Sequence, residues 1–124
     1  ESGALMPVKE IAAECRKRNI LFHTDAAQAC GKVNLQTLCG DADMITVVGH
    51  KLGAPKGIAA LYVRQGVPIP AGGILLQGGG QEFGTRGGTE NVPYIAGLGK
   101  AAELTVQDLD KNMQQMELMR SLLL

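Results

Sequence analysis

Apolar side chains recur near the start of the chain at the spacing of a helix. Positions i, i+3, i+4 and i+7 of one helix face are all apolar: Val8, Ile11, Ala12 and Cys15. Pro7 suits the first helical turn, because its missing N–H leaves no hydrogen bond unmade there, and Lys17 suits the negative end of the helix dipole. The pattern predicts a helix from Pro7 to about Arg18.

Short apolar runs then replace the helical pattern. They are Ile20–Phe22, Met44–Val48 and Ile58–Val63. Runs of this length that stop abruptly at polar residues or glycine are typical of buried strands. We therefore predict a strand at each of them.

The rest of the chain divides into a loop and a second helical segment. Residues 67–91 are rich in glycine and proline and predict a loop. Pro93 opens a helical pattern that continues to the end, and we expect Asp108 or a neighbour to break or restart it. The order helix, three strands, helix predicts an α/β fold.

Composition narrows the function. The chain has 124 residues, enough for one domain, and its 12 basic and 12 acidic side chains cancel. A net charge near zero supports neither a nucleic acid nor a membrane as partner. Of 17 glycines, 14 lie between Gly49 and Gly99, which indicates backbone that passes close to a ligand or to other backbone.

The cysteines and the chain ends bear on location. Cys15, Cys30 and Cys39 show no CxxC spacing, which argues against a disulfide framework or a zinc site and favours a reducing compartment, the cytosol. The chain begins at Glu1 without methionine and stops at Leu124 within a helical pattern. We therefore expect a fragment of a longer protein, which leaves a mitochondrial location open.

Reactive side chains follow the first two predicted strands. Asp25 and Gln28 come after one, and His50 and Lys51 after the other. In open α/β sheets, ligands bind beyond the carboxyl ends of the strands. On residue type alone, alternatives remain: Asp25 could cap a helix or form a loop salt bridge, and Lys51 could be a solvated side chain.

Three ordered strings resemble one family. They are HTDAAQACGK (23–32), TVVGHKLGAPKGIAALYVR (46–64) and GGGQEFGTRGGTENVPYIAGLGKAAEL (78–104). They resemble the class V aminotransferases, and more narrowly the cysteine desulfurases and selenocysteine lyases, which depend on pyridoxal 5'-phosphate (PLP). The resemblance implies that residues 1–124 are part of the large domain of an aspartate aminotransferase-like fold, a sheet flanked by helices. The N-terminal part of that domain and the small C-terminal domain would be absent.

The resemblance also implies a role for each matching residue. Lys51 would carry PLP as a Schiff base, and His50 would contact its phosphate. Asp25 would pair with the pyridine nitrogen, as a buried carboxylate that keeps the nitrogen protonated. Gln28 would hydrogen-bond the phenolic oxygen of PLP. Thr89 would reach across a homodimer interface to the phosphate bound by the partner subunit.

Other positions have weaker claims. Val48 stands where many family members have a serine that binds the phosphate, so that contact is missing or supplied elsewhere. We expect His23 to be structural, holding the strand end. Arg86 could bind a substrate carboxylate or order its loop. None of the cysteines matches the nucleophile of the desulfurases, which lies on a later loop of the family, and no metal site is expected.

The implied activity is cleavage of L-cysteine or L-selenocysteine to alanine plus sulfur or selenium, with an acceptor protein as a possible further partner. The alternative is a catalytically inactive product, either a truncated isoform or a dimerising remnant. The chain alone would lack the nucleophile loop and part of the cofactor pocket.

Overall fold

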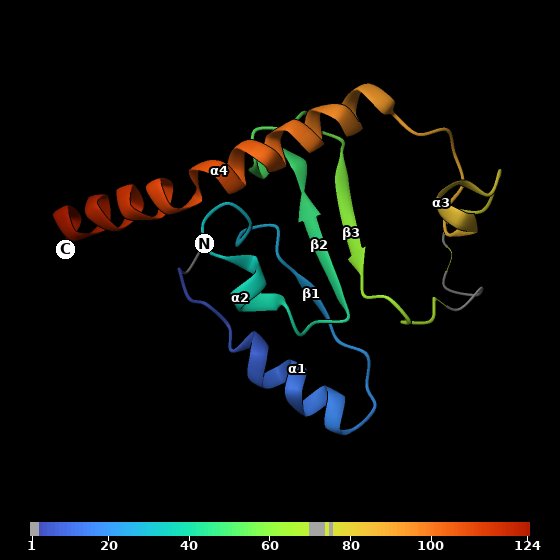
Figure 1. Cartoon of the computed structure of the whole chain (residues 1–124), viewed down its shortest axis with the longest axis horizontal. Coiled ribbons are helices and arrows are strands. Elements are labelled where there is room, and N and C mark those ends of the chain that lie inside the picture. The colour runs from blue at the N-terminus through green and yellow to red at the C-terminus, as the bar shows by residue number, and fades with distance from the viewer. Residues whose placement is uncertain (1–2, 70–73, 75) are drawn as a thin grey trace.

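A computed structural model describes residues 3–69, 74 and 76–124, which fold around one small sheet (Figure 1). Its strands are β1 (His23–Asp25), β2 (Met44–Val48) and β3 (Ala59–Val63), in that order across the sheet. β1 runs parallel to β2, and β3 runs antiparallel to β2. The predicted α/β class is confirmed, with a mixed sheet.

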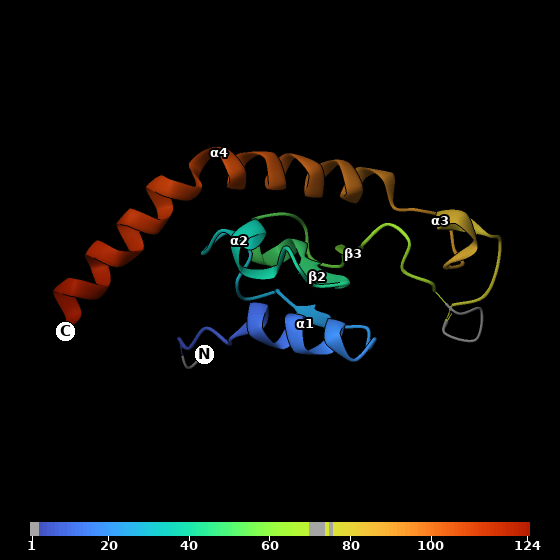
Figure 2. The same cartoon turned by 60° about the horizontal axis from the view of Figure 1, so that its bottom comes forward.

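Two helices lie on opposite sides of the sheet (Figure 2). The first, α1 (Val8–Lys17), has the predicted bounds within one residue and buries Val8 and Ala12. The second, α4 (Val92–Leu123), begins where the side chain of Asn91 accepts a hydrogen bond of 3.2 Å from the backbone N of Tyr94. This contact satisfies an N–H that the first helical turn leaves without a partner.

The predicted break at Asp108 is wrong. α4 is one helix of 32 residues, and Figure 2 shows that it bends near its middle without ending. Aspartate costs a helix interior only a few tenths of a kcal/mol, and neither glycine nor proline follows Gly99 in this helix. In the part of the chain that the structure describes, no helix is both long and apolar enough to cross a membrane.

The first strand lies later than predicted. The structure places β1 at His23–Asp25, whereas Ile20 and Leu21 are about half exposed and outside the sheet. The register explains this, because His23 pairs with Met44, the first residue of β2. β3 and β2 match the predicted strands, except that β3 begins at Ala59 and not at Ile58.

Three short elements were not predicted: α2 (Leu35–Cys39), the 3-10 turn η1 (Gly49–Lys51) and α3 (Gln81–Gly84). Each is too short to show a helical period in the sequence. α3 lies in the predicted loop and contains left-handed backbone at Glu82 and Phe83, with φ of 51° and 59°. Residues 70–73 and 75 of that loop lie outside the described residues.

The core is small. A buried cluster of Val8, Ala26 and Cys39 joins α1, α2 and the loop after β1, and Phe22, Leu38 and Ile45 pack against it. Most other buried side chains are alanine or cysteine. The cluster fixes one face of the β1–β2 pair and leaves the carboxyl ends of both strands at one edge.

Candidate functional site

The carboxyl ends of β1 and β2 bring four of the predicted site residues to one edge of the sheet: Asp25, Gln28, His50 and Lys51. Because the two strands are parallel, with Asp25 opposite Thr46, the segment after β1 and the segment after β2 leave the sheet on the same side. The backbone N of Ala26 donates a 2.9 Å hydrogen bond to the O of Thr46, which extends the pairing one residue beyond β1. Asp25 and Lys51 therefore share the edge at which α/β proteins bind ligands.

The carboxylate of Asp25 is anchored on the side of the following turn. Its Oδ1 accepts a 2.9 Å hydrogen bond from the backbone N of Ala27. This is the local turn-capping contact that the sequence left open as an alternative for Asp25. Within the described residues Asp25 forms no ion pair, so the other alternative, a loop salt bridge, is not seen there.

Asp25 and Gln28 line the same cavity, of about 600 Å³. Its walls come from the N-terminal segment, the loop after β1 and the second half of α4, and include Leu5, Met6, Lys32, Met113, Met116 and Arg120. His50, Lys51 and Thr89 are not part of this lining. The structure thus joins two of the predicted cofactor contacts in one hollow, whereas His50 and Lys51 follow β2 at the same sheet edge.

The turn that carries His50 and Lys51 is tightly folded against β3. The backbone N of Gly49 donates to the O of Ile58 at 3.0 Å, and the N of Leu52 and of Ala54 both donate to the O of Gly49. A Cβ on Gly49 would lie 2.8 Å from the O of Ile58, so only glycine fits there. Lys51 is therefore presented from a rigid turn and not from a loose loop.

The two site segments also meet below α4. A Cβ on Gly31 would lie 3.1 Å from Cδ2 of Leu52 and 3.3 Å from Cγ2 of Thr105, a residue of α4. A Cβ on Gly97 would lie 3.1 Å from Cδ of Pro55. Helix α4 thus packs on the segment after β1 and on the turn after η1. The cluster of glycines in the sequence indicated close approaches of this kind, but it did not indicate which elements approach each other.

One contact at this edge was not predicted. Nε2 of His23 lies 2.8 Å from Oγ1 of Thr46, within hydrogen-bond distance, across the β1–β2 pair. The expectation that His23 holds the strand end agrees with this contact. Thr46 was missed, because a threonine inside an apolar run reads as an ordinary strand residue.

Thr89 and Arg86 lie apart from this edge. Both are exposed, in the segment between α3 and α4. Figure 1 shows α3 to the side of the sheet, beyond β3 and far from β1. The role of Thr89 at a partner subunit stays a prediction, as does the choice of roles for Arg86.

The site residues are not buried in this chain. Asp25, Gln28, His50, Lys51 and Thr89 are all exposed. The chemistry calls for a buried carboxylate and a desolvated amine. The described residues leave this edge open to solvent, because α4 packs on the loops and does not cover these side chains.

The cysteines behave as small apolar side chains. Cys30 and Cys39 are buried and free, and burial raises the pKa of both thiols. A raised pKa keeps a thiol protonated and unreactive. Over residues 3–69, 74 and 76–124, no group of His, Cys, Asp and Glu is arranged to hold a metal ion.

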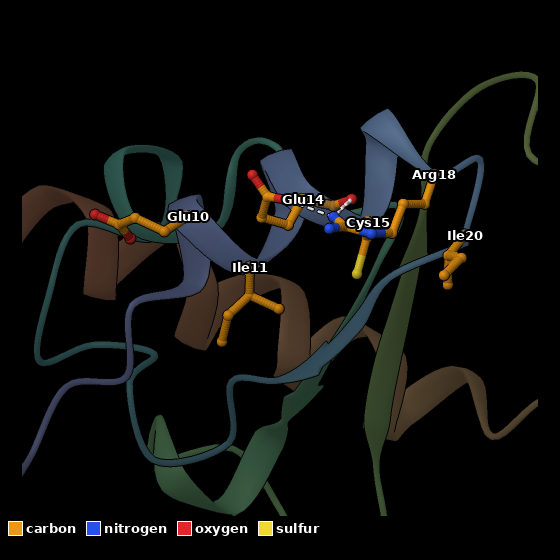
Figure 3. Close-up of a pocket in the computed structure, with 6 residues that line it drawn as sticks. All are labelled: Glu10, Ile11, Glu14, Cys15, Arg18 and Ile20. Carbon is orange, nitrogen blue, oxygen red and sulfur yellow. Dashed lines mark hydrogen bonds and ion pairs between the residues drawn. The ribbon is translucent and has the colours of Figure 1, made fainter.

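A second hollow, of about 310 Å³, lies beside α1 (Figure 3). Ile11, Cys15 and Ile20 form its apolar part, and Arg18 and Glu14 form an ion pair at its margin. None of the predicted site residues lines it. It therefore has no part in the candidate site.

Comparisons with known proteins agree with the architecture. A cysteine desulfurase of Nostoc sp. is 54% identical over 104 residues, which are 84% of this chain and 25% of that protein. The cysteine desulfurase IscS of Clostridium botulinum is 41% identical over 124 residues, all of this chain and 30% of that protein. A solved NifS-like protein matches with a TM-score of 0.80 at 40% identity, over 93% of this chain and 31% of its own.

A solved structure of DndA from Streptomyces lividans matches with a TM-score of 0.79 at 40% identity, over 90% of this chain and 32% of its own. The chain thus spans about a quarter to a third of the length of these relatives. The protein-family model described as aminotransferase class-V matches residues 1–123. Nearly the whole chain is covered by that match, and the chain belongs to the aminotransferase class-V family.

Proposed function

We propose that the protein carrying this chain is a PLP-dependent enzyme that cleaves the Cβ–S bond of L-cysteine, or the Cβ–Se bond of L-selenocysteine, to release alanine. The observation that carries the proposal is the parallel pairing of β1 and β2, which delivers Asp25 and Lys51 to one sheet edge. Family membership and relatives named cysteine desulfurases support it.

The donor set at this edge fits PLP. Asp25 offers an anionic oxygen for the pyridine nitrogen, and Gln28, on the same cavity wall, offers an amide for the phenolic oxygen. Lys51 offers the amine that holds the aldehyde carbon, and His50 beside it offers an N–H for phosphate. Thr89 would serve the cofactor of a second subunit, which makes a homodimer part of the proposal.

The residues of this chain then have distinct tasks. Bound PLP supplies an electron sink for the electron pair left when a proton leaves Cα of the substrate. Lys51 would move that proton as base and acid. Asp25 holds the proton on the ring nitrogen by Coulomb attraction. Gln28 donates to the phenolic oxygen without adding charge.

The finer choices are also proposals. The names of the curated relatives favour cysteine over selenocysteine as substrate. Cys30 and Cys39 are buried, which raises the pKa of their thiols, and Cys15 lies in the hollow beside α1 that no predicted site residue lines. The sulfur atom would therefore pass to a cysteine outside residues 1–124 and then to an acceptor protein. We propose a cytosolic location, which free cysteines support.

Replacement of Lys51 in the full-length protein tests the proposal. Lys51→Ala should abolish the visible absorption of bound PLP and lower alanine release from cysteine by several orders of magnitude, because it removes the amine that is proposed to hold PLP and to move the Cα proton. Lys56→Ala is the matched control, since it removes another exposed lysine from the same turn region and should change neither readout. Retention of both absorbance and activity by Lys51→Ala would falsify the assignment.

A second candidate function rests on the exposure of the site residues. The 124 residues by themselves leave Asp25 and Lys51 in water, where neither has the environment that PLP chemistry needs. A protein made of this chain alone would therefore be a non-catalytic product, a truncated isoform or a dimerising remnant. Equilibrium binding of PLP to the isolated chain separates the two candidates.

A further inference from the structure

Three side chains gather on one face of the β1–β2 pair at its carboxyl end. His23 and Asp25 are two residues apart on β1, so their side chains point to the same face. Thr46 is the register partner of Asp25 on β2 and shares that face. The other face carries Phe22 and Ile45, which pack against the core cluster.

The contact between His23 and Thr46 runs diagonally across this face. Nε2 of His23 lies 2.8 Å from Oγ1 of Thr46, and the backbone O of the same threonine accepts from the N of Ala26 at 2.9 Å. Thr46 therefore contacts the β1 segment at two points, at His23 before Asp25 and at Ala26 after it. A hydroxyl both donates and accepts, so the contact can form with either neutral tautomer of the imidazole.

The position of Asp25 depends on these two contacts of Thr46, with His23 and with the backbone N of Ala26. β1 has only three residues, and the one hydrogen bond of the Asp25 carboxylate within the described chain goes forward to the N of Ala27. That bond ties the carboxylate to the turn but does not tie the strand to its neighbour. A functional group must be held to about 0.5 Å of its working geometry by the residues that support it.

We propose that His23, held by Thr46, is a positioning residue that fixes the carboxylate of Asp25 against the ring nitrogen of PLP. This inference rests on the proposed function, since it names what sets one of its cofactor contacts. His23 acts through Asp25 and makes no contact with substrate. Loss of the hydrogen bond leaves β1 paired but lets its last residue shift, which weakens the ring contact more than it weakens the fold.

The test uses PLP titration of the apo form of the full-length protein, with the visible spectrum of bound PLP as a second readout. His23→Ala and Thr46→Val should each raise the dissociation constant of PLP about tenfold, the scale of one oriented hydrogen bond. Thr46→Ser keeps the hydroxyl and should restore wild-type affinity. The double variant His23→Ala/Thr46→Val should bind no more weakly than either single variant, because both remove the same contact.

Asp43→Asn is the matched control. It weakens the same strand pair at its opposite end, where Asp43 binds the backbone N of Phe22. At equal loss of stability it should leave PLP affinity and spectrum unchanged. If Asp43→Asn weakens PLP binding as much as His23→Ala, or if Thr46→Ser binds as poorly as Thr46→Val, the positioning role is wrong. If wild-type protein itself fails to bind PLP, the proposed function has failed instead.

Discussion

Gly49 shows how one residue shapes the site. Its backbone passes so close to β3 that a Cβ would lie 2.8 Å from the O of Ile58, 2.9 Å from Cγ2 of that residue and 3.2 Å from the Cβ of Ala54. The first of these neighbours is backbone directly before β3, and it is held in place by the hydrogen bond that it accepts from the N of Gly49. The two residues after Gly49 are His50 and Lys51, so any shift at position 49 is passed directly to the proposed cofactor amine.

Gly49→Ala should therefore cost roughly 1–3 kcal/mol of stability, the range seen when atoms are forced into a filled space. In the full-length protein it should also weaken PLP binding. Unfolding midpoints in urea and PLP titration measure the two effects. An unchanged midpoint would mean that the turn accommodates the methyl group and that the close approach is not a constraint.

Gly99→Ala is the control for the loss of a glycine. A Cβ on Gly99, in the interior of α4, would meet nothing within 4 Å. Since glycine lowers helix stability by roughly 0.5–1 kcal/mol relative to alanine, this substitution should stabilise the protein by that amount. PLP affinity should not change.

At the scale of elements, Asp43 holds the amino ends of β1 and β2 and the carboxyl end of β3 together. Its Oδ2 accepts from the backbone N of Phe22 at 2.8 Å, its backbone O accepts from the N of Arg64 at 2.8 Å, and its Oδ1 pairs with the guanidinium of Arg64. One buried side chain thus joins the start of β1 and the end of β3 to β2. The hydrogen bond from Phe22 N, with the Arg64 guanidinium, lowers the pKa of this carboxyl below its ordinary value.

A lowered pKa in the folded state makes the contribution of Asp43 depend on pH. The stabilisation is complete above the ordinary carboxyl pKa of about 3.9 and is lost as pH falls through the lower pKa of the folded state. Asp43→Asn should lower the free energy of unfolding by roughly 2 kcal/mol at pH 7. The difference from wild type should shrink below about pH 4, as measured by urea unfolding at several pH values.

Asp41→Asn is the matched control for Asp43. Asp41 pairs with Arg16 at 3.4 Å, but both side chains are about half exposed. An exposed pair contributes about 0–1 kcal/mol, so this substitution should change stability little at any pH. If Asp41→Asn and Asp43→Asn lowered the free energy of unfolding equally, the role of Asp43 in joining the strands would be contradicted.

At the scale of the whole molecule, this chain leaves much apolar surface uncovered. Phe83 is fully exposed, and Leu122, Leu123 and Leu124 are between 72% and 96% exposed. Among the described residues, the largest side chain that is completely buried is that of Cys39. The sheet edge with Asp25 and Lys51 is open in the same way, so this chain alone would offer the proposed cofactor contacts without the dry environment that the chemistry needs.

The isolated chain of 124 residues should therefore bind PLP weakly or not at all. A Schiff base on an exposed lysine forms with little selectivity, because water competes for the amine and for every polar contact of the ring. Titration followed by visible absorbance, with the Lys51→Ala chain as reference, measures the binding that depends on this site. Tight binding at one PLP per chain would show that the open edge suffices and would overturn the second candidate function.

Local sequence patterns predicted several parts of this fold well. The period of residues 8–17 predicted α1, and apolar runs predicted β2 and β3, because helical and strand spacing are properties of neighbouring residues. The motifs around Asp25, Gln28, His50 and Lys51 pointed to residues that follow two parallel strands and so lie at one edge of the sheet. Whether these residues carry PLP stays a prediction.

Contacts between distant segments were decided by tertiary structure alone. The shift of β1 to His23–Asp25 follows from its register with β2, and the pairing of His23 with Thr46 follows from that register in turn. The sequence also could not show that the site residues would be exposed in this chain. Burial is set by the elements that pack over a residue, whereas residue type and spacing are set by the chain itself.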